Sequence, residues 1–467
     1  MMTVVDALAR PALPPLVIER CAVATVDADG SEHADGHLVV DGGRIVAVGP
    51  GPALRVPEGA RQVDGGGCLV TPGLVNTHHH FSQWITRGFA PDVTLFEWLN
   101  ELYPVWALLD ADMLRAASLG SLAALVTTGC TTSADHHYVF PAGAGDLLAA
   151  EVDAAADIGV RLHLSRGSMD LGRAAGGLPP DEVVEETDAA LAATEAAIDR
   201  FHDAGPDAMV RVTVAPCSPF SVTTTLMREA ADLARRRGVR LHTHLAETVD
   251  ELKFCTDAYG CTPLEYVESL GWMGDDVWFA HGVHLDEQVA GRLAASGTGV
   301  AHCPSSNARL GAGIAPVAEL LRAGVPVGLG VDGTASNESG QLGPEMRAAL
   351  LAGRARGGPR AITTRQALAM ATIGGAQCLG RQGELGSLEV GKLADVAVWR
   401  LDTAAHAGIV DPVAALVLGS PPPLELLLVG GRPVVEAGRL VTLDVAALAR
   451  SVTQASKRLV QRWNAAR

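Results

Sequence analysis

The stretch TTLMREAADLARRRGVRLHTHLAE, residues 224–247, decides the fold. Its first part spaces apolar residues three and four positions apart and ends at Gly238, as amphipathic helices do. Its second part is a short β-rich run that closes on His242, His244 and Glu247. A helix that leads into a strand in this way is typical of one unit of a parallel α/β protein.

The same alternation continues across the middle of the chain. β-rich segments such as RLHLSR, MVRVTVAP, VWFAHGV, GVAHCP and VPVGLGVDG are separated by helical segments, among them residues 112–129 and 185–205. Six or more such units favour a (β/α)₈ barrel of the TIM type over an open sheet. We therefore predict a barrel over residues 71–383.

Short β segments with Asp-Gly and Gly-Gly turns flank this central region. They run up to residue 70 and return near the other end, in KLADVAVWRL and LELLLVGGRPVVEAGRL. Because two such segments can complete one sheet, we expect residues 1–70 and 384–440 to form a composite small β domain of the sandwich type. Residues 441–467 predict a C-terminal helix whose basic end suits the helix dipole.

The composition of the 467-residue chain, 48% hydrophobic and 19% charged, predicts a globular protein with a large core. A formal net charge of −17 argues against nucleic acids and anionic membranes as partners. No run reaches the ~18 apolar residues of a membrane span, the N-terminus lacks a signal-peptide pattern, and eight scattered cysteines indicate reduced thiols. We expect a cytoplasmic homo-oligomer that acts on a small molecule.

Titratable side chains gather at the carboxyl ends of the expected strands. They are His78, His80, Asp135, His242, His244, Glu247, His281, His302 and Asp332. Because the active site of a parallel barrel forms at this edge, we expect these groups to meet.

His78 and His80 stand two positions apart, so that in an extended strand both point to one face while His79 points away. A lone HxH pair is more often a hydrogen-bonded loop than a metal site. His244 and Asp332 complete a donor set that suits one divalent cation, Zn²⁺ or Fe²⁺.

Glu247 and His281 are weaker candidates on position alone. Glu247 follows His244 by three residues, which fits a solvated glutamate at a helix start as well as an acid–base group near a metal. A histidine after an apolar strand, such as His281, is more often structural.

Five ordered motifs, PGLVNTHHH, HTHLAE, FAHGVHL, HCPSSN and GLGVDGTASN, resemble the amidohydrolase superfamily. Within it they are similar to the aminohydrolase branch of nucleobase deaminases, S-adenosylhomocysteine deaminases and s-triazine hydrolases. The resemblance covers nearly the whole chain and implies one divalent metal per subunit, with zinc the first choice and iron the second. The metal ligands that it implies are His78, His80, His244 and Asp332.

The resemblance also implies a mechanism. The metal lowers the pKa of a water molecule that attacks the amino-bearing ring carbon. Glu247 moves the water proton to the ring nitrogen, Asp332 or Glu247 protonates the amine, and His281 stabilises the attacking oxygen.

The substrate is less sharply indicated. SADHHYVFP, SRGSMDLG and VAPCSPFSV look most like the 8-oxoguanine deaminases, which form urate and ammonia. Gln83 matches the glutamine with which guanine deaminases contact the purine, whereas Cys217 replaces their arginine, which favours an altered ring. The triazine hydrolases share the sequence motifs around Arg166 and Ser168, so these motifs do not distinguish a purine substrate from a triazine substrate.

The residues expected to bind substrate are Gln83, Trp106, Arg166, Ser168 and Cys217. For Trp106, Arg166 and Ser168, packing on the barrel rim is an equally good explanation. The alternative substrates are an s-triazine, isocytosine, guanine or a pterin carrying an amino or alkylamino group. A non-catalytic amidohydrolase-like binding module is a second alternative, which the complete set of motif positions disfavours.

Overall fold

The computed structural model describes residues 13–467 of the chain. The expectations for residues 1–12, which concern a leader and the start of the small domain, lie outside the described residues.

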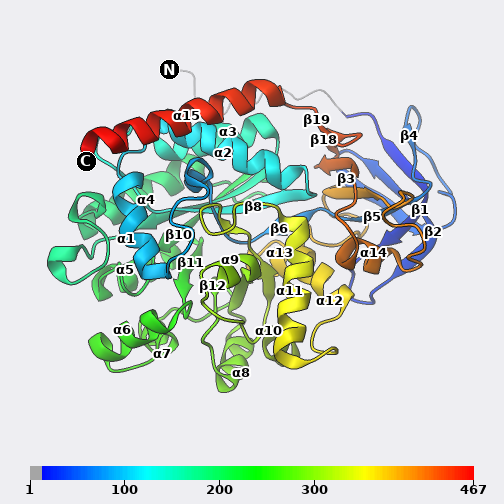
Figure 1. The fold of residues 1–467 in the computed structure, drawn as a ribbon. Coiled ribbons are helices and arrows are strands. Elements are labelled where there is room, and N and C mark those ends of the chain that lie inside the picture. The colour runs from blue at the N-terminus through cyan, green and yellow to red at the C-terminus, as the bar shows by residue number, and fades with distance from the viewer. Residues whose placement is uncertain (1–12) are drawn as a thin grey trace.

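A closed barrel of eight parallel strands forms the centre of the protein (Figure 1). In chain order the strands are β6 (Leu74–Asn76), β8 (Cys130–His137), β9 (Arg161–Ser168), β10 (Val210–Pro216), β11 (Arg240–Leu245), β12 (Val277–His281), β13 (Gly299–His302) and β14 (Val327–Leu329). Strand β14 pairs with β6 and closes the ring. The predicted (β/α)₈ barrel is confirmed.

Helices surround the barrel as the alternation predicts (Figure 1). They are α1 (Leu95–Trp106), α2 (Ala111–Val126), α3 (Leu147–Ile158), α4 (Thr187–Phe201), α5 (Thr224–Arg237), α6 (Val249–Tyr259), α7 (Pro263–Ser269), α8 (Glu287–Ser296), α9 (Pro304–Arg309), α10 (Val317–Ala323), α11 (Leu342–Gly357), α12 (Thr364–Ala369) and α13 (Gly375–Cys378). A 3₁₀ segment, η1 (Phe81–Thr86), follows the short strand β7 (His79–His80), which pairs with β15 (Asp332–Gly333).

The α5–β11 unit shows how local sequence builds the barrel. The Thr223 hydroxyl accepts a hydrogen bond from Leu226 N–H and caps the start of α5. Gly238 ends the helix in the left-handed conformation, with φ of 65°, and turns the chain into β11. Every residue of β11 after Arg240 is buried, as expected for a parallel strand covered on both faces.

A nine-stranded sheet lies beside the barrel (Figure 1). Its strands are β1 (Leu16–Ala24), β2 (Glu32–Asp41), β3 (Arg44–Pro50), β4 (Arg61–Asp64), β5 (Cys68–Pro72), β16 (Val396–Arg400), β17 (Leu424–Val429), β18 (Arg432–Glu436) and β19 (Arg439–Leu440). Strand β5 pairs with β1 on one side and with β16 on the other, so segments from both ends of the chain share one sheet. The division at residues 70, 384 and 440 stays a prediction.

Two more helices complete the fold. Helix α14 (Pro412–Leu418) connects strands of the sheet, and α15 (Val445–Ala466) lies across the barrel helices (Figure 1). Leu459 of α15 is fully buried. The Ser456 hydroxyl donates to the carbonyl of Ile85 at 3.0 Å, and Arg462 forms an ion pair with Asp110 at 2.6 Å. Helix α15 is thereby attached to η1, directly beside the predicted metal ligands.

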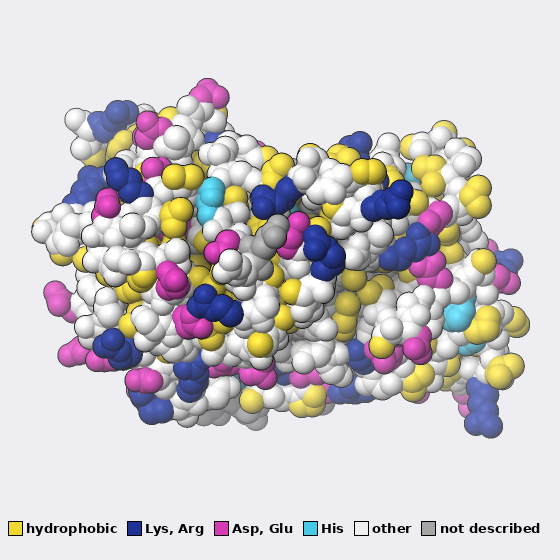
Figure 2. All heavy atoms as spheres, turned by 90° about the horizontal axis from the view of Figure 1, so that it is seen from below, with side chains coloured by type: hydrophobic (Ala, Val, Ile, Leu, Met, Phe, Trp, Pro, Cys, Tyr) yellow, Lys and Arg dark blue, Asp and Glu magenta, His cyan; other side chains and the backbone are white. Residues whose placement is uncertain are grey.

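The surface carries charges of both signs. Figure 2 shows Lys and Arg side chains interspersed with Asp and Glu on the described part of one face, where neither sign forms a continuous patch. Within residues 13–467, no helix has the length and apolar character needed to cross a membrane. All eight cysteines are free thiols.

Candidate active site

Four side chains converge where β6, β11 and β14 end. They are His78, His80, His244 and Asp332, all of them buried. The Asp332 Oδ1 atom lies 3.3 Å from the Nε2 atoms of both His78 and His80. The Nε2 atoms of His80 and His244 are 3.0 Å apart. The rings of His78 and His80 have their centroids 4.7 Å apart, whereas His79 packs edge-on against Phe81.

A hydrogen-bond relay determines which nitrogen of His78 carries the proton. The carbonyl of Trp278 accepts from His242 Nδ1–H at 2.9 Å, which leaves His242 Nε2 as an acceptor. That atom accepts from His78 Nδ1–H, also at 2.9 Å. His78 Nε2 is therefore unprotonated and directed at the cluster. It has no hydrogen-bond partner among the described residues.

His80 and His244 are oriented in the same way. His80 Nδ1–H donates to the carbonyl of His136, and His244 Nδ1–H donates to the carbonyl of Cys217, each at 2.6 Å. Burial lowers the pKa of both imidazoles, that of His244 to about 3, so both rings are neutral. Two nitrogen lone pairs thus face each other across 3.0 Å.

This arrangement of donors fits a cation. Facing lone pairs repel unless a proton or a metal ion lies between them. Burial opposes the charge of Asp332, but the His78 contact and the nearby histidines hold the pKa of this carboxyl well below its usual range. Three neutral imidazoles and one carboxylate form a donor set that divalent zinc or iron accepts.

Two of the residues at the site have an unusual backbone. The φ angles of His281 and Asp332 are 74° and 63°, in the left-handed region that residues with a side chain rarely adopt. Such conformations persist where the surrounding structure holds them, and they are common at functional sites. Here they place both side chains at the end of their strands, over the barrel mouth.

Glu247 faces the cluster without being part of it. Its Oε2 atom lies 3.6 Å from His281 Nε2. Burial raises the pKa of Glu247 to about 7, although the proximity of His281 counteracts the rise. His281 Nδ1–H donates to the Asn307 side-chain oxygen at 2.9 Å, so Nε2 is the nitrogen that faces the carboxylate. A carboxyl that titrates near neutrality can both take and give a proton.

Glu251 holds the turn that carries Glu247. Its two carboxylate oxygens accept from the backbone N–H groups of Ala246 and Glu247, each at 2.8 Å. Ala246 has a φ of 53°, so this clamp stabilises an uncommon backbone conformation. Glu251 is fully buried, and its place in HTHLAETVDE at the start of α6 gave no hint of this role.

A cavity opens onto this cluster. The residues that line it are His80, Gln83, Leu95, Trp98, Leu99, Tyr103, Tyr138, Cys217, Ser218, Phe220, His244, Glu247, His281, Leu310, Asp332 and Ser336. One side is aromatic or aliphatic, and the other side carries the titratable groups.

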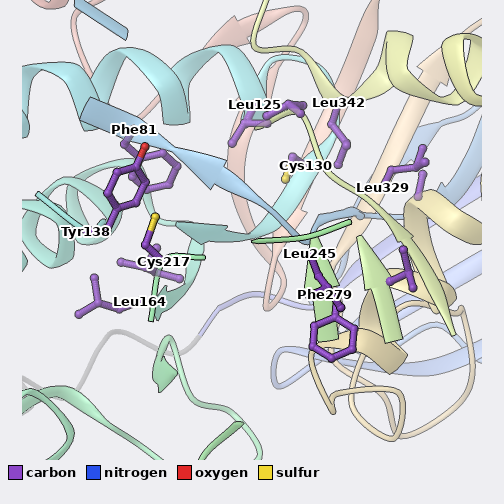
Figure 3. Close-up of a cluster of buried hydrophobic side chains, with 14 of the residues drawn as sticks. Phe81, Leu125, Cys130, Tyr138, Leu164, Cys217, Leu245, Phe279, Leu329 and Leu342 are labelled. Carbon is purple, nitrogen blue, oxygen red and sulfur yellow. The ribbon is translucent and has the colours of Figure 1, made fainter. Parts of the chain in front are cut away.

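Two of the expected substrate-binding residues line this cavity. The Gln83 side-chain oxygen accepts from Ala335 N–H at 3.2 Å, which leaves its NH₂ group for a ligand. Cys217 lies beside Tyr138, and in Figure 3 its sulfur points toward that ring. Burial raises the pKa of Cys217 to about 12, so it is a protonated thiol and a weak donor.

The other three expected contacts lie outside the cavity lining. Trp106 donates to the Thr86 hydroxyl at 3.2 Å and packs behind the site. Arg166 forms an ion pair with Glu185 at 2.7 Å. Ser168 ends β9 at the barrel rim.

Sequence reasoning missed the two tyrosines and Trp98. Tyr138 stands in SADHHYVFP, a word already singled out, directly after the end of β8. Tyr103 and Trp98 belong to α1, the same helix as Trp106. Trp106 shares the apolar face of α1 with Leu99 and Tyr103, so helix periodicity alone does not separate it from the cavity residues.

The model of the amidohydrolase family matches residues 69–434 of the chain. The chain belongs to the amidohydrolase family. This amidohydrolase is 46% identical over 432 residues to an 8-oxoguanine deaminase from Pseudomonas aeruginosa, covering 92% of this chain and 96% of that protein. It is 37% identical over 455 residues to a hydroxydechloroatrazine ethylaminohydrolase from Pseudomonas sp. strain ADP, covering 94% of each chain.

A solved structure is similar along most of the amidohydrolase. It is that of an atrazine chlorohydrolase from Arthrobacter aurescens TC1 complexed with zinc, with a TM-score of 0.90 and 34% identity over 94% of this chain and 100% of that one. The amidohydrolase is thus a hydrolase of the aminohydrolase type, and its buried imidazole and carboxylate donors suit a divalent metal ion.

Proposed function

We propose that this protein is a metal-dependent hydrolytic deaminase of an amino-substituted nitrogen heterocycle, with 8-oxoguanine as its first substrate. The observation that carries the proposal is the position of Glu247. This buried carboxyl has a pKa of about 7 and lines the cavity together with three of the proposed metal-binding donors, 3.6 Å from His281. Such a group suits the transfer of a proton from water to a ring nitrogen.

His78, His80, His244 and Asp332 would hold the metal ion. When bound there, a divalent cation supplies a Lewis acid that lowers the pKa of water toward neutrality. The hydrogen bonds from Nδ1 of each histidine keep the three Nε2 atoms free of protons and aimed at one point. The Ser306 hydroxyl donates to Asp332 Oδ2 at 2.5 Å and orients the carboxylate.

The chain's own groups account for the proton transfers. Ionised Glu247 accepts a proton from the water that adds to the amino-bearing ring carbon, and it gives that proton to the adjacent ring nitrogen. The second proton of that water, on the new hydroxyl group, passes through Glu247 or Asp332 to the amino group, the C–N bond breaks, and ammonia leaves as the carbonyl forms. Burial opposes the charge of His281, but the Glu247 and Asp332 carboxylates raise its pKa, so the ring can carry protons on both nitrogens. Its Nε2–H can then donate to the oxygen that becomes this carbonyl.

Three polar groups of the cavity support a purine that carries extra carbonyl oxygens. Gln83 offers an NH₂ group, Tyr138 a hydroxyl, and Cys217 a protonated thiol, all of which can donate to carbonyl or ring-nitrogen acceptors. Guanine deaminases, which this chain resembles elsewhere, have an arginine at the position of Cys217. A neutral donor there suits an 8-oxo group, and the similar 8-oxoguanine deaminase of P. aeruginosa supports the same choice.

An ammonia-release screen tests the proposal. The purified protein is supplied with zinc and compared on 8-oxoguanine, guanine, isocytosine, isoxanthopterin and aminotriazines. We expect the highest kcat/KM on 8-oxoguanine, with urate as the product. Release of ethylamine from an ethylamino-triazine at a higher kcat/KM would instead support the s-triazine alternative, which the 37% identical ethylaminohydrolase keeps open. Absence of turnover on every compound would contradict deamination.

Cys217→Ala separates recognition from chemistry. Because Cys217 is placed as a donor to the substrate and not as a proton carrier, we expect kcat/KM to fall more for 8-oxoguanine than for guanine. Ser339→Ala, which lies outside the cavity lining, serves as the matched control. Equal losses on the two purines would remove Cys217 from the recognition of the 8-oxo group.

A further inference from the structure

A second cavity lies at the opposite end of the barrel from the candidate active site. It has a volume of about 750 Å³ and is lined by the first residues of β9, β10 and β11. Its polar lining residues are His163, His202, Arg211, Thr213, Arg240 and Glu384. Strand β11 carries Arg240 at this end and His244 at the other, about 13 Å away at ~3.3 Å per residue.

The lining carries more positive than negative charge. Arg211 donates to Glu384 at 2.6 Å, and Arg381, directly behind, donates to the same carboxylate at 2.7 Å. Arg240 donates to the carbonyls of Cys378 and Asp275 and pairs with no carboxylate in the described part of the chain. Three guanidinium groups thus lie near one carboxylate, which only Arg211 and Arg381 contact, in a protein whose net charge is −17.

Other acidic groups near the cavity offset this charge only in part, since the Asp275 and Asp276 carboxylates act on Arg240 through space. Asp276, at the edge of β12, pairs with Arg235 at 3.1 Å. Asp203 is exposed and accepts from the backbone N–H of Gly205.

Several donors remain free to bind a ligand. His163 is 1% exposed and lines the cavity, yet neither ring nitrogen has a hydrogen-bond partner within residues 13–467. The Nε atom of Arg211 is also buried without a partner there. His202 Nδ1 accepts from Val212 N–H at 3.1 Å, which makes its Nε2–H a donor. A buried imidazole without any partner is costly unless something else satisfies it.

We propose that this cavity binds a phosphate group, either as inorganic phosphate or as the phosphate of a small ester. Arg211 keeps its Nε–H free, and Arg240, whose Nε and Nη2 groups donate to carbonyls, keeps its Nη1 group, so both can donate to phosphate oxygens. The excess of guanidinium charge attracts an anion such as phosphate, which carries about −1.5 to −2 at pH 7. His163 and His202 add N–H donors. The cavity is separate from the deaminase site, so this inference does not depend on the proposed function.

Titration calorimetry tests the proposal on the full-length, zinc-loaded protein at low ionic strength. Inorganic phosphate and a nucleoside 5′-monophosphate are titrated separately. Tighter binding of the nucleotide identifies a phosphate ester as the ligand, and tighter binding of phosphate identifies the free ion. Either result supports the site if the measured affinity falls when a lining residue is replaced. Absence of binding by both compounds at millimolar concentration overturns it.

The lining residues are tested with matched charge variants. Arg211→Gln and Arg240→Gln each remove one guanidinium, and we expect each to weaken binding about tenfold or more, as the loss of a charge-assisted hydrogen bond does. Arg228→Gln, on the exposed face of α5, removes the same charge elsewhere and should leave binding unchanged. Equal effects from all three variants would show a nonspecific charge effect and overturn the site.

A measurement on the unaltered protein covers the case in which the arginine variants fail to fold. His202 is partly exposed, like His33, and can be carbethoxylated by diethyl pyrocarbonate. We expect phosphate to protect His202 and to leave His33, on strand β2 of the small sheet, modified at the same rate. Unchanged modification of His202 at saturating phosphate would contradict binding in this cavity.

Discussion

At the scale of single residues, the site depends on which atoms hold protons. The three imidazoles proposed to bind the metal ion each donate a hydrogen bond from Nδ1–H, to His242 Nε2 or to a main-chain carbonyl, and keep Nε2 unprotonated. Glu247 remains the one carboxyl of the cavity with a pKa of about 7. In the proposed chemistry the imidazoles hold the metal ion, and Glu247 is the group that transfers protons.

Glu247→Gln tests this division. The amide has the size of the carboxyl but cannot carry the proton, so we expect kcat to fall about 10²–10⁴-fold while zinc remains stoichiometric. Ammonia release and metal analysis are the two measurements. Asp250→Asn, an exposed carboxyl three residues along, is the control and should keep full activity. Near-normal turnover of Glu247→Gln would remove this residue from the mechanism.

At the scale of elements, strand β8 and helix α3 meet in a buried pair of carboxyls. Asp135 Oδ1 accepts from Phe81 N–H at 2.6 Å, beside His80. Glu151 packs next to it, with its Oε1 atom 3.4 Å from His137 Nδ1. Burial raises the pKa of Asp135 to about 7, and burial together with Asp135 raises the pKa of Glu151 well above its usual range. The two groups cannot both ionise at low cost.

Glu151→Gln should flatten the pH dependence of stability. In wild type the folded-state pKa values exceed those of the unfolded chain, so this stability is fully present below the unfolded values and is lost as pH rises through about 7. We expect the variant to gain melting temperature relative to wild type on going from about pH 6 to about pH 9. Asp153→Asn, exposed on the same helix, is the control. A difference in melting temperature between wild type and variant that stays constant across this pH range would contradict the raised pKa values of the two carboxyls.

Helix α15 is the second element with a testable role. Leu459 is its fully buried anchor, and Ser456 hydrogen-bonds the carbonyl of Ile85 in η1, the segment that carries Gln83. Leu459→Ala should lower the free energy of unfolding by about 2–5 kcal/mol and raise KM, because η1 loses its support. Lys457→Ala on the exposed face should change neither. Chemical denaturation and steady-state kinetics provide the measurements, and an unchanged KM would exclude the coupling to η1.

Alternating strands and helices made the barrel predictable, because periodicity and strand-end position follow from backbone geometry alone. The same geometry placed His78, His80, His244 and Asp332 together. For Trp106 substrate contact and rim packing were equally good explanations, and it lies outside the cavity lining, because sequence spacing does not show how far along a helix the cavity extends. The ion pair of Arg166 with Glu185 joins residues 19 positions apart, and no local pattern marks it.

At the scale of the whole molecule, the donor set joins strands from distant parts of the barrel. His78 and His80 follow β6, His244 belongs to β11, and Asp332 follows β14. An ion bound by all of them would cross-link the barrel mouth and stabilise the folded state by mass action.

Metal removal should therefore lower both activity and stability. We expect a chelator to abolish ammonia release and to reduce the melting temperature, with both restored by added zinc. His80→Asn, which lacks one donor, should show a smaller chelator-dependent shift. An equal shift in this variant would place the stabilising ion elsewhere in the molecule.

The sheet shared by the two ends of the chain has a consequence for synthesis on the ribosome. Strand β5 leads into the first barrel strand, but its neighbour β16 begins only at Val396. At about 5–20 residues per second, the nascent protein spends tens of seconds with that edge of β5 open. During this time the open edge can pair with other chains. Mispairing at β5 is thus a risk during synthesis, before β16 covers this edge.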